Sequence, residues 1–141
     1  MPYEPYHFFS VRSAYPGLPM KDLKEIAKAL MDGPGLTWFD FQGRVIASFG
    51  MRKMAPKVYE AWLVCSDLAS SRTIQLISLI RRHLAAHVRD LRPDRIQAVI
   101  LTDRPVQVRL VKRIMKFEYE GTLRKYLYGR DHYMFALIPG G

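Results

Sequence analysis

The sequence predicts an α+β domain in which helices flank a mixed, mostly antiparallel sheet. Short apolar segments have the length and the β-branched or aromatic content of strands, and longer segments have helical spacing. The order strand–helix–strand in the middle of the chain requires a right-handed crossover between parallel strands. Strand pairs joined by short turns on either side predict antiparallel hairpins. We expect one domain over residues 1–141, with 1–10 as a candidate extended N-terminal arm.

The N-terminal half is expected to hold a strand, a helix and a hairpin. The helix has one apolar stripe, formed by Leu23, Ile26, Ala27 and Leu30, and a segment rich in Gly and Pro ends it. Gln42-Gly43 separates two strands at the spacing of a hairpin. The expected elements are a strand over 7–12, a helix over 20–31, hairpin strands over 36–41 and 44–50, and a basic loop over 52–57.

The C-terminal half is expected to alternate strands and helices before a final hairpin. A central strand begins near Lys57, and the helix after it starts at Thr73 and ends before Pro93. Asp103 is in position to cap a further helix, with Pro105 in its first turn. The remaining expected elements are a strand over 95–101 that is covered on both faces, and strands over 117–128 and 132–138 joined by a Gly-Arg-Asp turn.

Composition and charge limit the class of protein. With 49% apolar and 12% aromatic residues the chain is not a disordered protein, and 22 Lys and Arg against 13 Asp and Glu give a formal charge of +9. This excess favours a phosphate-bearing or polyanionic partner. Nucleic acid, an acidic protein, a phosphorylated cofactor and a merely solvated basic face all stay open. No helix-turn-helix, RNA-recognition or zinc-finger pattern supports the nucleic acid.

Several residue types argue against particular chemistry or locations. Cys65 is the single cysteine, and within an apolar strand it is expected to be a buried structural thiol rather than a nucleophile. His83 and His87 are spaced i, i+4 without a third ligand, so we expect no metal. No apolar run is long enough to cross a bilayer and no secretory signal begins the chain, so we expect a cytoplasmic protein without a membrane span.

The segment from Val58 to Val88 is the best candidate for a binding site. It joins an apolar strand to a basic amphipathic helix through a Ser-containing turn, LASSR. Such a turn directs backbone N–H groups and the positive end of the helix dipole to one point, where phosphate oxygens bind well. The alternative, which these residues leave equally open, is that Ser70 or Ser71 only caps a structural helix.

Residues 36–141 resemble the GNAT superfamily, the GCN5-related N-acetyltransferases. The run FEYEGTLRKYLYGRDHYMFALI is similar to the family's final hairpin, with an aromatic residue, Glu-Gly, a basic stretch, a Gly-Asp turn and an aromatic-rich strand. RPVQVRLVKRIM falls where the family has its fourth helix, and SSRTIQLISLIRRHL where it has the helix that holds acyl-coenzyme A. The resemblance implies a GNAT-like acyl-CoA acyltransferase fold and direct acetyl transfer from acetyl-CoA to an amine.

The resemblance implies a pyrophosphate-binding loop that starts at Arg72. The family pattern is Gln/Arg-x-x-Gly-x-Gly/Ala, and here Gln75 and Ile77 stand at the two glycine positions. Glycine lets the backbone come close to the phosphates, so these replacements put the binding of acetyl-CoA in question. The cofactor-binding residues implied by the resemblance are Val64, Ser66, Ser70, Ser71, Arg72, Thr73 and Gln75.

The resemblance also implies catalytic residues. Family members frequently place a Glu at the start of the central strand as the base for the amine, and Glu60 lies there. The alternative role of Glu60 is a salt bridge with Arg52 or Lys53. The family's proton donor, a Tyr in the fourth helix, has no counterpart in this chain. Substitute donors are Tyr126, Tyr128 and Tyr133, of which we take Tyr128, although aromatic residues in a terminal hairpin more often serve packing.

A narrower likeness concerns the ends of two strands. The Ser-Asp pair that closes the central strand and the C-terminal FALIPGG resemble small GNAT-like proteins of short-tailed bacteriophages, some of which are internal virion proteins. Three functions therefore stand as hypotheses. They are an N-acetyltransferase with a degenerate pyrophosphate loop, a catalytically inactive phage structural or partner-binding protein located in the host cytoplasm or the virion, and a basic nucleic-acid-binding module.

Overall fold

The structure, a computed structural model, describes residues 1–4 and 20–140. The strand predicted over 7–12 and the remainder of the predicted arm, 5–10, lie outside the described residues. Within the described part, the chain divides into two compact units. The first is made of residues 1–53 and 62–82, and the second of 54–61 and 83–141. The single domain expected from the sequence stays a prediction.

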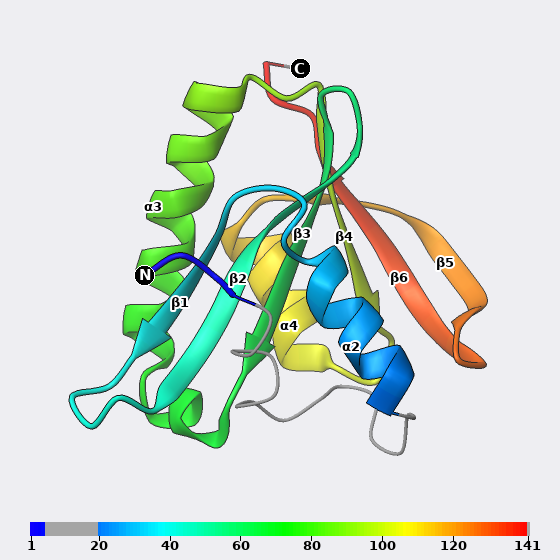
Figure 1. The fold of residues 1–141 in the computed structure, drawn as a ribbon. Helices are drawn as coiled ribbons and strands as arrows, with labels where there is room; N and C mark the ends of the chain where they lie inside the picture. Colours follow the sequence, from blue (N-terminus) through cyan, green and yellow to red (C-terminus); the bar gives the residue numbers. More distant parts are fainter. Residues whose placement is uncertain (5–19, 141) are drawn as a thin grey trace. The chain divides into compact units, whose positions relative to one another are not determined.

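The described residues form the α+β fold that the sequence predicts. The six-stranded sheet has the order β1-β2-β3-β4-β6-β5, in which β3 and β4 are parallel and the pairs β1–β2, β4–β6 and β5–β6 are antiparallel. Figure 1 labels these elements. The strands are β1 (Gly35–Phe39), β2 (Val45–Ala55), β3 (Val58–Cys65), β4 (Arg95–Leu101), β5 (Glu118–Leu127) and β6 (Arg130–Leu137), and the helices are α2 (Met20–Ala29), α3 (Thr73–Leu91) and α4 (Pro105–Arg109).

In the first unit, α2 packs through its predicted apolar stripe. Ala27 is fully buried beside Tyr3, whose hydroxyl donates to the Ala27 carbonyl at 3.0 Å. The ring of Tyr3 meets that of Trp62 edge-on, with centroids 4.8 Å apart. α2 ends two residues earlier than predicted, because the N–H groups of Met31 and Asp32 donate to carbonyls three residues back and tighten the last turn.

The first three residues extend along β1. Met1 and Thr37 exchange hydrogen bonds of 2.7 and 3.0 Å, and the Tyr3 N–H donates to the Gly35 carbonyl at 3.0 Å. β1 lies at one edge of the sheet. The N-terminal residues therefore satisfy backbone groups that an uncovered edge strand would leave open.

The basic loop predicted over 52–57 is wrong, because β2 continues to Ala55. The backbone N–H groups of Met51 and Lys53 donate to the carbonyls of Pro34 and Asp32, so this segment is held as a strand while Lys53 itself stays exposed. The connection to β3 is only the turn Pro56-Lys57, in which Lys57 has a positive φ of 62°. The prediction took the charged residues near the end of β2 for a loop.

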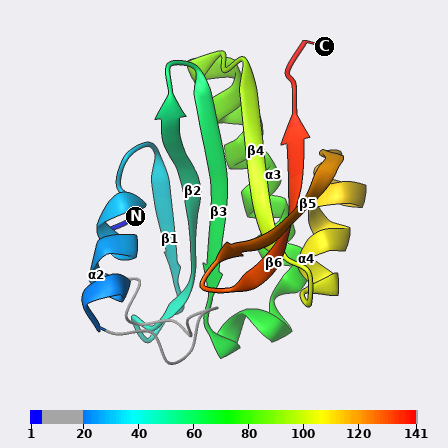
Figure 2. The ribbon, with the colours of Figure 1, turned by 90° about the vertical axis from the view of Figure 1, so that its right-hand side faces the viewer.

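In the second unit, β4 pairs with β3 on one side and β6 on the other (Figure 2). Its residues alternate between buried and half-buried and none is exposed, as expected for a strand covered on both faces. β5 and β6 form the predicted hairpin, but the predicted Gly-Arg-Asp turn is wrong, because Arg130 and Asp131 belong to β6. The turn is Tyr128-Gly129, with φ values of 53° and 70°. Two consecutive positive φ values match the right-handed twist of the hairpin.

The helix cap predicted at Asp103 is wrong. Arg104 occupies the N-cap position of α4 without a side-chain hydrogen bond, and Asp103 Oδ2 instead accepts from Arg130 at 2.7 Å. A charge-assisted bond to a guanidinium is stronger than a bond to a neutral N–H, so the Asp103 carboxylate binds Arg130 rather than capping the helix. α4 keeps Pro105 in its first turn and continues as a π-helical segment over Leu110–Ile114.

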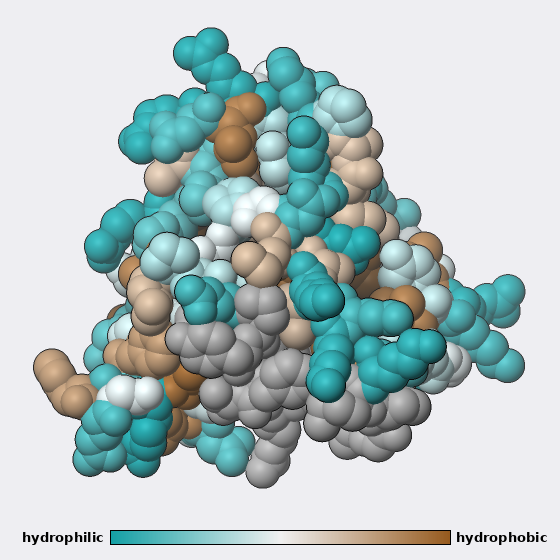
Figure 3. Space-filling model, viewed as in Figure 1, coloured by the Kyte–Doolittle hydropathy of each residue, from teal (hydrophilic) through white to brown (hydrophobic). Residues whose placement is uncertain are grey.

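Figure 3 shows one face of the molecule, which is largely hydrophilic with separated hydrophobic areas. No helix within the described ranges, 1–4 and 20–140, is long and apolar enough to cross a bilayer. Exposed cations on α4, the π-helical segment, β5 and the connection between them include Arg109, Lys112, Arg113, Lys116, Arg124 and Lys125.

Candidate functional site

The turn after β3 is anchored to the first unit by Ser66. The Ser66 N–H and its Oγ both donate to the Ile46 carbonyl, each at 3.0 Å. Oγ also accepts from the Leu68 N–H at 3.3 Å and so caps a 3-10 helix over Asp67–Ser71. Below it lies a hydrophobic cluster of Ile46, Ala47, Ala69 and Leu76, against which Trp38, Leu63, Cys65, Leu68 and Ile80 pack.

Much of the polar capacity of this turn is used within the turn itself. The N–H groups of Ala69 and Arg72 donate to the carbonyls of Ser66 and Ala69 at 3.1 and 3.0 Å. Ser70 Oγ donates to the Asp67 carbonyl at 2.9 Å, and Thr73 Oγ1 donates to the Ser70 carbonyl at 3.3 Å. The helix-capping hydroxyl is therefore that of Ser66, for the 3-10 helix, while Ser70 binds a carbonyl.

Arg72 is turned back on the same segment. Its Nη1 donates to the Leu68 carbonyl at 2.8 Å and contacts Ser71 Oγ at 3.3 Å. The guanidinium thus stabilises the 3-10 helix from its carbonyl side. To bind a phosphate with this nitrogen, Arg72 must give up the bond to Leu68.

α3 begins directly after Arg72 and offers backbone donors. The first N–H that bonds within the helix is that of Leu76, which donates to the Arg72 carbonyl at 2.9 Å. The three preceding residues, Thr73, Ile74 and Gln75, have exposed side chains, and the first N–H groups of a helix have no intrahelical acceptor. These N–H groups can bind an anion at the positive end of the helix dipole. Gln75, at the first glycine position of the family pattern, stands among them.

The strand that leads into the turn is structural. Cys65 is half-buried against the cluster beneath α3, and burial raises the pKa of its thiol to about 11. A thiol with this pKa is almost entirely protonated near neutral pH and is a poor nucleophile. Val64, also half-buried, packs beside Tyr3 and Ala27. Neither side chain is therefore suited to chemistry of its own.

In the second unit, Glu60 belongs to a chain of side-chain hydrogen bonds that the sequence did not reveal. Glu60 Oε1 accepts from Gln97 Nε2 at 3.2 Å, and Gln97 Oε1 accepts from Arg95 Nε at 3.1 Å. The Arg95 guanidinium then makes two bonds with Glu120, at 2.6 and 3.0 Å. We call Glu60, Gln97, Arg95 and Glu120 the strand-borne network, because all four lie on β3, β4 or β5.

Ionisation in the strand-borne network follows from the pair at its end. The hydrogen bond with Glu120 raises the pKa of Arg95, and the hydrogen bond with Arg95 lowers the pKa of Glu120. Both shifts favour the charged forms, so this ion pair is formed over the whole neutral range. Its partners are partly exposed, with side-chain exposures of 27% and 39%, so solvent screening keeps its contribution to stability small.

Tyr128 lies in the β5–β6 turn and is about half exposed. Glu60 pairs with Gln97 of β4, and His132, on the strand that follows the turn, pairs with Leu101 of β4. Gln97 and Leu101 are four positions apart. That is about 13 Å along the strand. The structure therefore does not bring Tyr128 and Glu60 to one point, and a donor role for Tyr128 stays a prediction.

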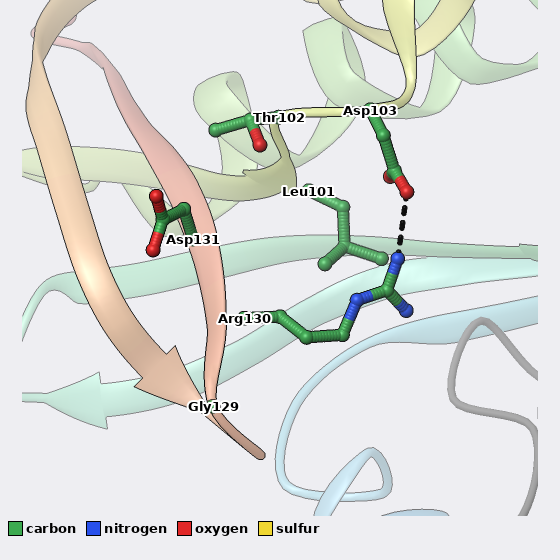
Figure 4. Close-up of a pocket in the computed structure, with 6 residues that line it drawn as sticks. All are labelled: Leu101, Thr102, Asp103, Gly129, Arg130 and Asp131. Atoms are coloured by element: carbon green, nitrogen blue, oxygen red, sulfur yellow. Dashed lines mark hydrogen bonds and ion pairs between the residues drawn. The ribbon is translucent and has the colours of Figure 1, made fainter.

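Beside that turn lies a polar hollow of about 300 Å³. Figure 4 shows Arg130 reaching across it to Asp103, while Asp131 lies apart from this pair. Asp131 Oδ1 accepts from the Lys125 N–H at 2.9 Å. Both carboxylates are thus engaged in holding the hairpin. The hollow is lined by Leu101, Thr102, Asp103, Gly129, Arg130 and Asp131.

The predicted site residues fall into two groups. The predicted cofactor residues are contiguous in the first unit, from Val64 to Gln75, whereas Glu60 and Tyr128 belong to the second. Gln97 and Arg95 were missed, although a pattern could have found them. They are the two polar residues in the apolar run RIQAVIL, and their spacing of two places them on the same face of β4.

Comparison with known proteins gives matches among solved structures. No protein-family model matches the sequence, and no curated protein matches it significantly. An acetyltransferase of the GNAT family from Bacillus anthracis has a TM-score of 0.71 at 14% identity, covering 97% of this chain and 92% of its own. Mutant forms of the spermidine/spermine N-acetyltransferase SpeG from Vibrio cholerae have a TM-score of 0.71 at 15% identity, covering 98% and 92%.

A third match supports the same fold. The ribosomal-protein-S5-alanine acetyltransferase from Vibrio fischeri has a TM-score of 0.68 at 13% identity, covering 85% of this chain and 70% of its own. At these identities the likeness is one of fold rather than of activity. This chain therefore has the fold of the GNAT superfamily of N-acetyltransferases.

Proposed function

We propose that this protein is an acyl-CoA-dependent N-acetyltransferase that transfers an acetyl group directly to an amine. The observation that carries the proposal is Glu60, a strand carboxylate held by a hydrogen bond from Gln97 within a GNAT fold. A base must present an unprotonated oxygen in a fixed direction, and a carboxylate that accepts from an amide meets this requirement. Acetyl-CoA would supply the activated acetyl thioester, in keeping with the cytoplasmic location predicted from the sequence.

The residues around α3 fit the phosphates of such a cofactor in part. The N–H groups of Thr73, Ile74 and Gln75 would bind pyrophosphate oxygens, and Arg72 would add charge after leaving the Leu68 carbonyl. The side chain of Gln75 occupies space that the family pattern leaves to glycine. We therefore propose binding that is weaker than a glycine-containing loop would give, with Ser66, Ser70 and Ser71 shaping the turn.

In the proposed reaction, Glu60 removes a proton from the amine, directly or through a water molecule, as the nitrogen attacks the thioester carbonyl. The C–N bond forms, the C–S bond breaks, and the coenzyme A thiolate leaves and takes a proton from solvent. The bond from Gln97 engages Oε1, which leaves Oε2 for the amine. The structural neighbours include enzymes named for spermidine and for the alanine of a ribosomal protein, so the acceptor we propose is a primary amine. A polyamine and a peptide N-terminus are the two classes to test.

The second candidate is a catalytically inactive protein of this fold that binds a macromolecular partner, including the phage structural role. The observation that favours it is the turn over 66–72, in which Ser70 Oγ and the Arg72 guanidinium donate to carbonyls of the turn itself. Nucleic-acid binding by the exposed cations of α4 and β5 is a third reading. Retention on DNA that does not fall with rising salt would contradict this third reading.

The experiment that separates these functions measures release of free coenzyme A from acetyl-CoA, with spermidine and an N-terminal alanine peptide as acceptors. The proposal expects amine-dependent release together with an acetylated product, identified by mass. Glu60→Gln serves as the variant that lacks the base, and Glu118→Gln, an exposed Glu on β5, serves as the matched control. Absence of turnover with every amine tested, although the protein is folded, would favour the inactive partner-binding protein.

A further inference from the structure

We propose that Gln97 is a positioning residue for Glu60, which holds the carboxylate in one orientation as a neutral hydrogen-bond donor. The inference rests on the proposed function and adds residues that the resemblance did not supply. It stands on four side-chain hydrogen bonds within the second unit, which join β3, β4 and β5. A single continuous chain of donors and acceptors leads from Glu120 to the proposed base.

The orientation of the Gln97 amide is fixed by chemistry. Arg95 Nε carries a proton and has no acceptor capacity, so the Gln97 atom 3.1 Å away must be the carbonyl oxygen. The other end of the amide, Nε2, is then a donor, and it lies 3.2 Å from Glu60 Oε1. Glu60 must accept this bond. An ionised carboxylate, which is the form that a base needs, can accept this bond and keep its second oxygen for another partner.

Arg95 is itself held in place by Glu120. Two parallel bonds, of 2.6 and 3.0 Å, fix the plane of the guanidinium and leave Nε directed to Gln97. Because this ion pair is partly exposed, it adds little to stability, and its effect is mainly to fix geometry. The backbone supports the same register, since Glu60 and Gln97 are directly paired residues of the parallel ladder.

The neutral link has a consequence for basicity. A guanidinium bonded directly to Glu60 would favour the ionised carboxylate so strongly that it would become a weak base. In this network the charge of Arg95 is balanced by Glu120, and the hydrogen bond that reaches Glu60 comes from an uncharged amide. Gln97 thus orients the carboxylate without the loss of basicity that an adjacent cation would cause.

The first test follows the Gln97 side-chain amide by NMR in isotope-labelled protein over a pH titration. We expect its two amide protons to be resolved and to shift with one transition, which disappears in Glu60→Gln. A Gln97 signal that does not respond to pH, or responds equally in Glu60→Gln, would overturn the inference. This readout requires no activity, so it decides the placement even if the protein transfers no acetyl group.

The second test is kinetic and uses Gln97→Glu, Gln97→Leu and the control Gln107→Leu, which replaces another half-buried Gln of the same unit. Gln97→Leu should lower kcat about tenfold with KM for the amine nearly unchanged. Gln97→Glu should move the acid limb of the rate profile about one pH unit upward, because a second carboxylate disfavours ionised Glu60. Gln107→Leu should change neither.

The outcomes separate the two proposals. If the wild type shows no transfer, the proposed function fails and the NMR titration alone decides the role of Gln97. If the wild type is active and Gln97→Glu leaves the acid limb in place, the positioning role is contradicted while the proposed function stands. A role limited to sheet stability would lower the unfolding midpoint of Gln97→Leu without moving any pH profile.

Discussion

Two regions of this protein use hydrogen bonds in opposite ways. In the turn over 66–72, the hydroxyls of Ser66 and Ser70 and the guanidinium of Arg72 donate to carbonyls of the turn or of β2. In the strand-borne network, the bonds end on a carboxylate, Glu60, with one oxygen engaged. The hydrogen bonds of the turn stay within the turn and its neighbouring strand, whereas those of the network lead to the carboxylate that we propose as the base. A turn whose sequence pattern identifies a site need not itself bind the ligand. Strands hold chemical groups more rigidly than loops do.

The largest expected effect comes from removing the carboxylate of the strand-borne network. Glu60→Gln keeps the size of the side chain but removes the base, so the rate of acetyl transfer should fall by about 10²–10⁴-fold. The fold should be unchanged, as measured by circular dichroism and unfolding midpoint. A rate within about twofold of the wild type would assign the base to another group.

The next effect tests whether the strand before the turn is as closed as the structure indicates. Because burial raises the pKa of Cys65 to about 11, the thiolate is scarce at mildly alkaline pH, and alkylation should be about a hundredfold slower than for a free thiol. The rate should recover in denaturant. Fast alkylation of the native protein would mean that the cluster beneath the turn opens readily, which would weaken the contrast between the two regions.

Arg72→Ala should have a smaller effect on the binding of acetyl-CoA. The guanidinium must exchange its bond with the Leu68 carbonyl for one with a phosphate, so only part of a charge-assisted bond is gained. We expect the dissociation constant to rise about tenfold, measured by calorimetry. Arg89→Ala, an exposed Arg at the other end of α3, is the control. An unchanged constant would show that Arg72 serves only the turn.

The smallest expected effect concerns the hydrogen bond between the Tyr3 hydroxyl and the Ala27 carbonyl in the first unit. Tyr3→Phe removes the bond to the Ala27 carbonyl and should cost about 1 kcal/mol of unfolding free energy in urea. Burial raises the pKa of Tyr3 to about 12, above its unfolded value of about 10. Its stabilising contribution is therefore complete below about pH 10 and is lost as the pH rises through about 12. Tyr3→Phe should lack this alkaline loss, and an equal loss in both proteins would contradict the assignment.

Much of the fold followed from local patterns. The stripe from Leu23 to Leu30, the helix that begins at Thr73 and the strand RIQAVIL have the periodicity that packing requires, and all three are present. The failures have a common cause. Charge at Arg52 and Lys53 suggested a loop, but backbone pairing with Asp32 holds this segment as a strand. The carboxylate of Asp103 suggested a helix cap, but it forms an ion pair with Arg130 instead. Both partners lie about twenty or more residues away in the chain.

The elements that carry the candidate site were predictable from the sequence, but the hydrogen bonds between its side chains were not. The position of Glu60 at the start of β3 and the donors at the start of α3 follow from sequence order. The inward turn of Arg72 and the bond between Gln97 and Glu60 do not, because they depend on rotamers and on strand register. Gln97 and Glu60 are 37 positions apart in the chain, and no local pattern encodes a bond between them.

Calorimetric titration of the wild-type protein with acetyl-CoA is the decisive test of an acetyl-CoA-dependent enzyme with a weakened phosphate turn. We expect saturable binding with a dissociation constant of about 10–100 μM, which corresponds to roughly −7 to −5.5 kcal/mol, and weaker binding by Arg72→Ala. No heat of binding at about 1 mM acetyl-CoA, from a protein that unfolds cooperatively, would contradict it.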